Sequence, residues 1–471
     1  MARVLFVYRN VLGVPYIDFG IAGLSAFLKE HGHETGLVDF TFGLKTSQAI
    51  GQAKCFNPDL VCFPSRSNEF EHIVGFATEL KKQLVVPFFC GGPHPTIAPE
   101  DALRDCFDGI CIGEGELALL ELVEKIAQKK SFYSTKNFWF HHNGKIVKNK
   151  VRPLIQDIDE LPLLDFGLFD MNRYLSARDW QIDYMGMRGC PFNCTYCINH
   201  VSQKIYRGMG KYTRLKSVGK MIAELKELVK KYSPKSIYFS DEIFCISTER
   251  MKEFAEKYSK EIGLPFECFA RADLCTEDGM RYLKKANCAK LCIAIESGDE
   301  NLRRKLLNKQ ISDEQIINAF RLARKYGIHT MSCNMIGLPF ETPKQIEKTI
   351  ELNKKAMSDS LQVSTFVPFH GTELYNFAKE NGLLAGKMGV SYYFGVYLKN
   401  PNLSPKQLEH YRKWFSFKAY EDRSKTKACL LLLRDTIIPY YLRYGSRIPI
   451  SMKKIIYRLF WHTKALKFLG K

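Results

Sequence analysis

The sequence predicts an α/β protein: an N-terminal doubly wound (Rossmann-like) sheet, then a partial (β/α)6 barrel of the TIM type, then a basic helical C-terminal region. Strand-like runs alternate with helical runs twice along the 471 residues, and the final stretch is helical and rich in Lys and Arg. A chain of this length divides into several cores. We expect the domains at residues 1–130, 179–384 and 385–471, with 131–178 as a linker.

The first region alternates short apolar runs with amphipathic ones. Its expected strands are Val4–Tyr8, Leu60–Pro64, Pro87–Cys90 and Gly109–Ile112, and its expected helices are Ala22–His31, Ile73–Gln83 and Glu116–Ala127. Parallel sheets bind ligands at the carboxyl ends of their strands. Small and polar residues gather there, at Ser65–Asn68, Gly91–Thr96 and Gly113–Glu116. The sequence therefore places a ligand site at this sheet edge.

The expected linker loses the alternating period and contains a short hairpin around Asn143-Gly144 and a proline-containing approach at Leu161–Asp165. Six further strand–helix units follow it, which suggests an incomplete barrel with its chemistry at the carboxyl ends of the strands. The expected strands are Ile182–Met187, Ser236–Ser240, Phe266–Ala270, Leu291–Ile295, Thr330–Ile336 and Leu361–Val367.

Composition and charge narrow the class of protein. The N-terminal apolar run is short and is interrupted by Arg9, which does not fit a signal peptide, so we expect an intracellular, cytoplasmic protein. Its fifteen cysteines then serve core packing or metal ligation rather than disulfides. Five of them lie in apolar strand-like runs and are expected to be core: Cys62, Cys90, Cys111, Cys292 and Cys333.

A tight cysteine triplet follows the first barrel strand. Cys190, Cys194 and Cys197 lie on one loop, where three thiolates can hold three corners of a four-iron four-sulfur cluster and leave one iron open. An open iron can chelate the amino and carboxylate groups of a methionine moiety. Two other readings of the triplet are a Cys3His zinc site that uses His200 and a set of buried cysteines.

The Cys-x3-Cys-x2-Cys spacing, with an aromatic residue before the last cysteine, resembles the radical S-adenosylmethionine (SAM) superfamily. Further landmarks of that family fall at successive strand ends: Ser240-Asp241-Glu242, Arg271, Ile295–Gly298, Gly337–Thr342 and Phe366–Thr372. Their order disfavours zinc. The resemblance implies SAM contacts from Tyr196, Asp241, Glu242, Arg271, Glu296, Ser297, Gly337 and Pro339.

The first region lacks the Gly-x-Gly-x-x-Gly turn of dinucleotide-binding sheets. Its glycine-rich loops instead resemble the cobalamin-binding domain that precedes the barrel in one subgroup of radical SAM enzymes, the class B methyltransferase-like subgroup. The resemblance implies cobalamin contacts from Ser65, Gly91, Gly92, His94, Thr96, Gly113 and Glu114. The loop Arg9–Gly13 does not match Asp-x-His-x-x-Gly, so we expect no histidine ligand to cobalt from the chain.

The resemblance implies an enzyme that uses a 4Fe-4S cluster, SAM and cobalamin, and that forms a 5′-deoxyadenosyl radical. The leading expectation is methylation of an unactivated carbon, or phosphorus, centre of a small molecule or lipid. One alternative is a radical ring-forming or oxidative rearrangement of a lipid or pigment without methyl transfer. Another is a cobalamin- or redox-sensing binding protein. An external electron donor such as flavodoxin or ferredoxin is the expected partner.

The C-terminal tail carries more than half of the net charge of +19, because residues 423–471 contain twelve Lys or Arg and one acid. This favours an anionic partner for the tail over a general nucleic-acid surface. Residues 452–466 place apolar and basic side chains on different helix faces. Such a helix either packs on the barrel, the commoner outcome, or lies on an anionic membrane at its cytoplasmic face.

Overall fold

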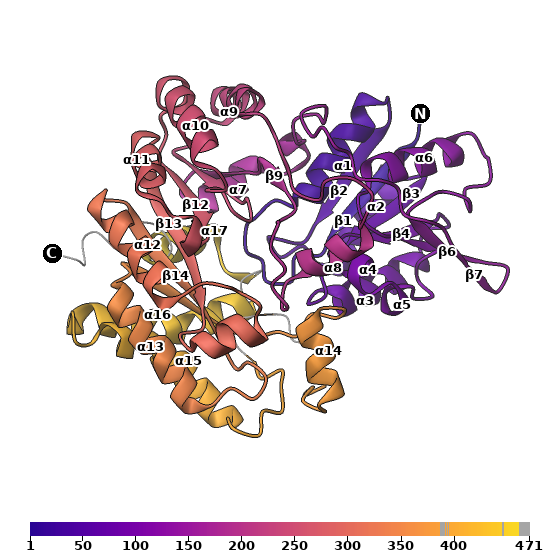
Figure 1. Cartoon of the computed structure of the whole chain (residues 1–471). Coiled ribbons are helices and arrows are strands. Elements are labelled where there is room, and N and C mark those ends of the chain that lie inside the picture. The colour runs from indigo at the N-terminus through magenta and orange to yellow at the C-terminus, as the bar shows by residue number, and fades with distance from the viewer. Residues whose placement is uncertain (387–390, 392, 394, 445–446, 461–471) are drawn as a thin grey trace.

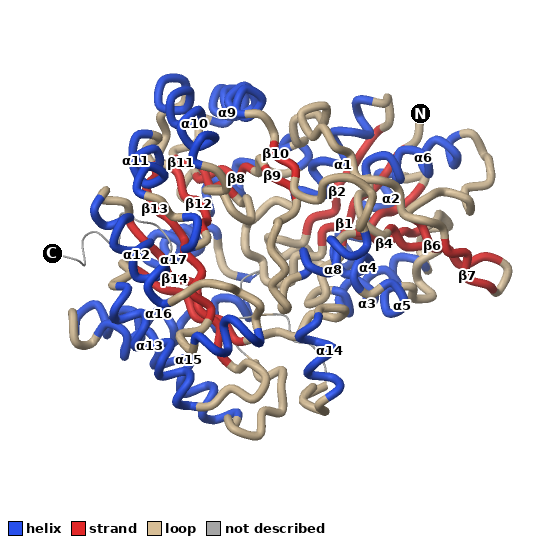
Figure 2. The backbone as a smooth tube through the Cα atoms, viewed as in Figure 1, coloured by secondary structure: helices blue, strands red, loops and turns tan. Residues whose placement is uncertain are grey.

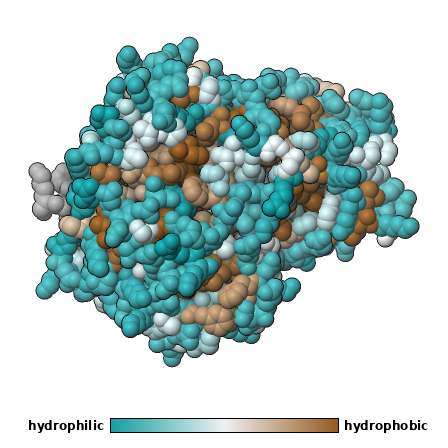
Figure 3. All heavy atoms as spheres, in the orientation of Figure 1, coloured by the Kyte–Doolittle hydropathy of each residue, from teal (hydrophilic) through white to brown (hydrophobic). Residues whose placement is uncertain are grey.

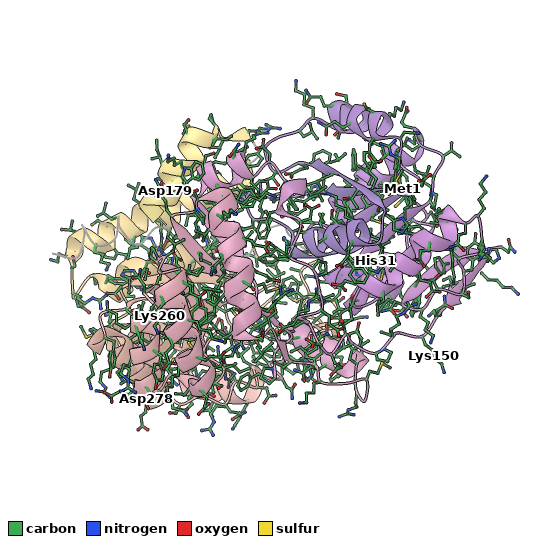
Figure 4. All side chains as sticks on the ribbon, turned by 90° about the horizontal axis from the view of Figure 1, so that it is seen from above. Met1, His31, Lys150, Asp179, Lys260 and Asp278 are labelled. Carbon is green, nitrogen blue, oxygen red and sulfur yellow. The ribbon has the colours of Figure 1, made fainter. Side chains whose placement is uncertain are left out.

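The computed structural model describes the chain except residues 387–390, 392, 394, 445–446 and 461–471. It consists of two α/β halves with the C-terminal helices packed on the second (Figure 1). Seen from above, Met1, His31 and Lys150 lie on one side and Asp179, Lys260 and Asp278 on the other (Figure 4). The face shown in Figure 3 is mostly hydrophilic, with hydrophobic atoms in separate patches.

The first half is a seven-stranded sheet in the order β2-β1-β3-β4-β5-β6-β7. Its strands are β1 (Arg3–Tyr8), β2 (Glu34–Asp39), β3 (Leu60–Pro64), β4 (Phe88–Gly91), β5 (Gly109–Cys111), β6 (Phe138–His142) and β7 (Lys145–Lys148). The first five pair in parallel, whereas β6 and β7 are antiparallel. The expected doubly wound sheet is confirmed. Strand β2, at the edge of the sheet, was not expected; only Thr35 and Val38 of its six residues are buried, as suits an edge strand.

Helices cover both faces of this sheet. Its helices are α1 (Phe19–Glu30), α2 (Thr46–Phe56), α3 (Phe70–Lys81), α4 (Pro93–Ile97), α5 (Pro99–Ala102) and α6 (Glu116–Ala127). The apolar residues of α1 and α6 join one core cluster and those of α2 and α3 join another. Because each helix buries a stripe of apolar side chains against the sheet, the two clusters fix the layer order.

The segment that we expected to be a linker is partly built into the first domain. The hairpin β6–β7 extends the first sheet, and Phe138 and Phe140 are buried in its core. After it come the 3-10 turn η1 (Phe166–Leu168) and α7 (Met171–Ala177). The expectation of a linker was therefore wrong for the hairpin, because alternating aromatic residues on β6 complete the apolar face of the sheet.

The second half is an open sheet of six parallel strands in the order β15-β14-β13-β12-β11-β8. The six expected barrel strands are thus confirmed (Figure 2). They are β8 (Gln181–Tyr184), β11 (Ser236–Phe239), β12 (Phe266–Ala270), β13 (Cys288–Glu296), β14 (His329–Ile336) and β15 (Ser360–Thr365). The small ribbon of β9 (Met187–Arg188) and β10 (Arg214–Leu215) flanks the first of them.

Amphipathic helices cover the outside of this sheet, and all of the α-helices except α8 bury apolar residues in a core cluster. The barrel helices and turns are α8 (Ile198–Ile205), α9 (Val218–Tyr232), α10 (Thr248–Glu261), η2 (Ala272–Leu274), α11 (Glu277–Lys285), the π-helical turn η3 (Leu302–Leu306), α12 (Asp313–Lys325), α13 (Pro343–Ala356) and α14 (Glu373–Glu380). The six parallel strands with helices outside them form a partial barrel, which stays open between β15 and β8.

The described C-terminal helices are α15 (Pro405–Tyr420), α16 (Lys425–Tyr444) and α17 (Ile450–Phe460). Helix α15 packs against α13 and α16, and α17 packs against α7. Residues of α16 and α17 also contact Leu12 and Val14 of the first domain. None of the described helices has the length and apolar character needed to span a membrane.

Candidate functional site

The cysteine loop joins β9 to α8 and is held from both sides. Gly189 has φ of +77°, and a side chain there would overlap the backbone of Tyr212. The Gln203 side-chain amide donates to the Cys190 carbonyl oxygen at 2.6 Å, and the Thr195 hydroxyl donates to the Leu306 carbonyl oxygen at 2.6 Å. The three thiols therefore sit on a loop whose backbone is fixed before any ligand binds.

The groups around the thiols suit an anionic iron–sulfur cluster. The Arg271 guanidinium lies 4.0 Å from Cys194 Sγ, and the Asn199 amide nitrogen lies 3.7 Å from Cys197 Sγ. Arg271 also stacks 3.7 Å above the Phe192 ring, which fixes its orientation. Burial raises the pKa of Cys197 to about 12, so its thiolate needs nearby positive charge, which iron supplies. The donor set fits a cluster on Cys190, Cys194 and Cys197.

His200 has a different partner from the one that a zinc site requires. Its Nε2 lies 2.8 Å from Glu373 Oε1, and Lys204 shares the same carboxylate. This pairing holds α8 to α14 across the mouth of the barrel. The structure thus gives no support to a Cys3His site.

The two acidic residues after β11 have different positions. Asp241 is buried and its Oδ1 accepts a hydrogen bond from the Gly186 backbone nitrogen at 2.7 Å, which ties down the turn before the cysteine loop. The Glu242 side chain reaches solvent. The protein around its carboxyl partly desolvates it, and this raises the pKa of the carboxyl. Glu242 also raises the pKa of Cys190 and Cys197. Glu242 is therefore the acid beside the thiols, and Asp241 positions their loop.

Glu296 ends β13 in an unusual conformation. Its φ is +65°, and the pairing of β13 with β14 shifts register between Ala294 and Glu296. The kink brings the carboxylate to the Tyr196 hydroxyl, which donates to it at 3.0 Å, and to Lys309, 3.3 Å away. Ser297 is fully buried, and its carbonyl oxygen accepts from Arg303 at 2.6 Å. The local strain thus presents Glu296, not Ser297, to the barrel mouth.

The loop after β14 is organised by one buried carboxylate. Glu341 Oε2 accepts hydrogen bonds from the backbone nitrogens of Gly337 at 2.6 Å and Leu338 at 3.1 Å. The Asn400 amide donates to the Leu338 carbonyl oxygen at 3.0 Å from the C-terminal region. Complete burial raises the pKa of Glu341 to about 8. Gly337 and Pro339 thus lie on a loop held from inside by Glu341.

Small residues line the carboxyl ends of β3, β4 and β5. Gly92 has φ of +94°, and a side chain there would press on the Ser65 backbone at 3.0 Å. The Thr96 hydroxyl donates to the Gly92 carbonyl oxygen at 2.8 Å and accepts from the Gly113 nitrogen at 2.9 Å. Ser65, Gly91, Gly92, Thr96 and Gly113 therefore form one hydrogen-bonded edge, called here the glycine edge. Its half-buried glycines, which have no side chains, fit the close approach of a large planar ligand.

His94 and Glu114 were expected beside cobalamin, but the structure gives both of them other partners. His94 is 1% exposed and faces Ser67 and Asp101. The Glu114 carboxylate lies 2.7 Å from Arg214 and 3.3 Å from Arg188, both of which come from the barrel half. We therefore assign Glu114 to the contact between the two halves, and the contacts of His94 and Glu114 with cobalamin stay predictions.

Two further residues of the site were not indicated by the motifs: Tyr206, at the contact between the halves, and Lys309, within the barrel half. The Tyr206 hydroxyl accepts a hydrogen bond from the Glu114 nitrogen at 2.8 Å, and a side chain at Gly113 would overlap this hydroxyl. Lys309 lies beside Glu296. Neither lies in a recognised spacing, although an aromatic residue directly after the helix that follows the cysteine loop was a usable signal for Tyr206.

Helix α8, which begins directly after Cys197, packs against α4, which begins directly after Gly92. The cysteine loop and the glycine edge are thereby brought to one junction. The family model of the radical SAM superfamily matches residues 184–352, and the family model of the B12 binding domain matches residues 7–123. The chain belongs to the radical SAM superfamily, in the group that carries a B12-binding domain.

Named relatives agree with this assignment. An uncharacterized methyltransferase of Pyrococcus horikoshii is 29% identical over 80% of this chain and 81% of its own. An anaerobic magnesium-protoporphyrin IX monomethyl ester cyclase of Rubrivivax gelatinosus is 24% identical over 90% of this chain and 79% of its own. This fold is shared by a solved structure, that of the cobalamin-dependent SAM radical enzyme OxsB with aqua-cobalamin and SAM bound. The TM-score is 0.71 at 16% sequence identity, and the match covers 100% of this chain and 74% of that chain.

Proposed function

We propose that this radical SAM enzyme transfers a methyl group to an unactivated carbon, or phosphorus, centre of a small molecule or lipid. The observation that carries the proposal is the contact of α8 with α4, which brings the cysteine loop and the glycine edge to the same junction. When bound, the cluster with SAM supplies the radical and cobalamin supplies the methyl group. A substrate held at this junction would be within reach of both.

The residues of the chain divide the binding work. Arg271 balances the negative charge of the thiolates, because its guanidinium is buried 4.0 Å from Cys194 Sγ. Glu242, beside Cys190 and Cys197, is the proposed partner of the SAM amino group. Tyr196, Glu296 and the loop of Gly337 and Pro339 line the rest of the proposed SAM site. Ser297 and Asp241 support it from behind.

At the glycine edge, Ser65, Gly91, Gly92, Thr96 and Gly113 are the proposed cobalamin contacts. Thr96 keeps the edge rigid, since it bonds to Gly92 and Gly113 at once. In the loop after β1, the Asn10 side chain is bound to the Val14 carbonyl oxygen, and the loop contains no histidine. We therefore keep the proposal that the chain supplies no histidine to cobalt from this loop.

The test is anaerobic reconstitution with iron, sulfide, hydroxocobalamin, a strong reductant and SAM that carries a trideuterated methyl group. Mass spectrometry should detect 5′-deoxyadenosine, S-adenosylhomocysteine and, in an extract that contains the substrate, a product heavier by a labelled methyl group. Replacement of Cys190, Cys194 and Cys197 by alanine should abolish cluster absorbance and 5′-deoxyadenosine. Cys429→Ala is the matched control, because this exposed cysteine lies on α16.

The named alternatives predict different products. A ring-forming or oxidative reaction, the class to which the Rubrivivax gelatinosus relative belongs by name, would yield 5′-deoxyadenosine and no labelled product. A binding protein would yield no nucleoside product at all. Either result would contradict methyl transfer. An external low-potential donor of the flavodoxin or ferredoxin type is proposed as the physiological reductant.

We also propose that the C-terminal helices contact an anionic membrane surface. Met452 and Ile455 of α17 are 51% and 55% exposed, and Tyr440 of α16 is 64% exposed. These apolar side chains lie within a tail of net charge +11. Each basic residue near an anionic surface contributes about 1 kcal/mol. The sequence suggested that the apolar and basic side chains of this helix lie on separate faces. In the structure the basic residue Lys453 is buried, whereas the apolar residues Met452 and Ile455 are exposed.

Liposome flotation tests this contact. Full-length protein should float with vesicles that contain anionic lipid at low salt, and a Met452→Ser, Ile455→Ser variant should float less. The sequence also assigns six further residues to this amphipathic helix, and their side chains or backbone lie outside the described residues: Arg458, Leu459, Phe460, Lys464, Leu466 and Lys467. Equal and negligible flotation of both proteins would leave the tail as a packing element.

A further inference from the structure

A histidine–aspartate–histidine cluster lies beside the glycine edge and outside the proposed cofactor sites. His94 comes from α4, Asp101 from α5 and His370 from the loop between β15 and α14. One ligand atom from each lies within 4.8 Å of the other two. We propose that these three residues bind a zinc ion that joins the B12-binding domain to the barrel.

The distances agree with a common metal. His94 Nε2 lies 3.1 Å from Asp101 Oδ2, and His370 Nδ1 lies 3.7 Å from the same oxygen. Two ligands of a tetrahedral zinc ion with bonds of about 2.0 to 2.1 Å are separated by about 3.3 Å. The two observed separations bracket this value. Two nitrogens and one oxygen are also ligands that zinc accepts readily.

The orientation of His94 supplies independent support. This side chain is 2% exposed, and its Nε2 makes no hydrogen bond although Asp101 Oδ2 is 3.1 Å away. The oxygen therefore lies off the direction in which an N–H group of this ring would point. A linear hydrogen bond does not give that arrangement. Two ligands that bind one ion at a roughly tetrahedral angle do.

The surroundings orient the ligands as in known metal sites. The His94 Nδ1 atom lies 3.1 Å from Ser67 Oγ, and this hydroxyl oxygen can accept a hydrogen bond from Nδ1–H, which leaves the lone pair of Nε2 for a metal. Arg104 donates to Asp101 Oδ1 at 2.9 Å, which leaves Oδ2 directed at the two histidines. The rings of Phe70 and Tyr375 lie 4.1 Å and 4.6 Å from those of His94 and His370, measured between centroids.

The position of the cluster indicates its role. A side chain at Gly371, the neighbour of His370, would overlap the Ile97 carbonyl oxygen, so the two backbones are in close contact. A zinc ion here would fix the loop after the last barrel strand to α4, and α4 also contacts α8. The ion would thus stabilise the junction on which both proposed cofactor sites depend. The inference rests on the cluster geometry and does not require methyl transfer.

The test compares His370→Ala and Asp101→Asn with wild type in reconstituted full-length protein. His410→Ala is the matched control, because this exposed histidine lies on α15. Zinc is added as its chloride, excess metal is removed by desalting, and zinc and iron are measured together. Wild type and the control should each keep one zinc per chain. The two variants should bind zinc about 100-fold more weakly, with unchanged iron content.

X-ray absorption at the zinc edge identifies the ligands in the same samples. Nitrogen and oxygen neighbours at about 2.0 to 2.1 Å, with imidazole scattering, are expected. Sulfur at about 2.3 Å would mean that zinc occupies the cysteine loop instead. That result, equal zinc affinity in all four proteins, or no zinc in wild type would each overturn the proposal. His370 is only partly buried, so its loss is compatible with folding, and the iron content checks this.

Discussion

Replacement of Glu341 by glutamine should remove a large pH dependence of stability. Burial raises the pKa of this carboxyl from 4.5 to about 8 in the folded chain. Between these values the unfolded chain loses the proton first, so the folded state binds more protons than the unfolded state. The free energy of unfolding therefore falls as pH rises from about 4.5 to 8 and levels off above pH 8. Glutamine does not titrate, and its oxygen can still accept from Gly337 and Leu338.

The magnitude follows from the same pKa values. The interval from 4.5 to about 8 corresponds to at most on the order of 5 kcal/mol, at about 1.4 kcal/mol per pH unit. Hydrogen bonds from two backbone nitrogens stabilise the charged form, and the pKa of about 8 already includes their effect. We expect the difference between wild type and Glu341→Gln to change by about 2 to 4 kcal/mol between pH 5 and pH 8.

Thermal unfolding followed by circular dichroism at pH 5, 6, 7, 8 and 9 measures this difference. The midpoint of wild type should fall by several degrees relative to Glu341→Gln as the pH rises to 8. Glu314→Gln is the control, because Glu314 is an exposed glutamate on α12. Parallel midpoints of wild type and Glu341→Gln across the whole range would refute the account of the buried carboxyl.

Two further substitutions test the junction between the halves. Gly113→Ala should destabilise the protein by about 2 kcal/mol or more, because φ is +81° and the new methyl group would displace the Tyr206 hydroxyl. Cobalamin affinity should fall as well. An unchanged melting temperature and unchanged cobalamin binding would contradict this prediction. Lys453→Met should increase the rate of amide hydrogen exchange in residues 450–456 about tenfold, because the buried Gly13 carbonyl oxygen loses its donor, the Lys453 ammonium 2.8 Å away. An unchanged exchange rate would show that other contacts hold the helix.

Local patterns were sufficient to predict most of the fold. The six barrel strands are apolar runs followed by helical sequence, and parallel strands with helical crossovers have few alternative arrangements. The edge strand β2 was missed because it begins and ends with the acidic residues Glu34 and Asp39 and has no continuous apolar run. The hairpin β6–β7 was assigned to a linker because its segment loses the alternating period of the flanking regions. Both errors concern segments whose structure depends on pairing with a distant strand.

The candidate site shows the same division between local and long-range information. The cysteine spacing and the glycines at the strand ends are local signals, since loop chemistry requires those residue types at those positions. Nothing in the chain's local pattern indicated that Asp241 would bond the Gly186 backbone while Glu242 would influence the thiols. These roles depend on which way a strand end turns, and that direction is fixed by packing.

Consecutive residues were enough to indicate the order of the two α/β regions, the three thiols and the glycine-rich loops. The folded structure was needed to show that Glu114 pairs with Arg188 and Arg214, and that His94 meets Asp101 and His370. It also decided that Lys453 is buried. Such contacts join residues up to 440 positions apart, and a buried charge or imidazole is tolerated only where distant chain segments supply its partner.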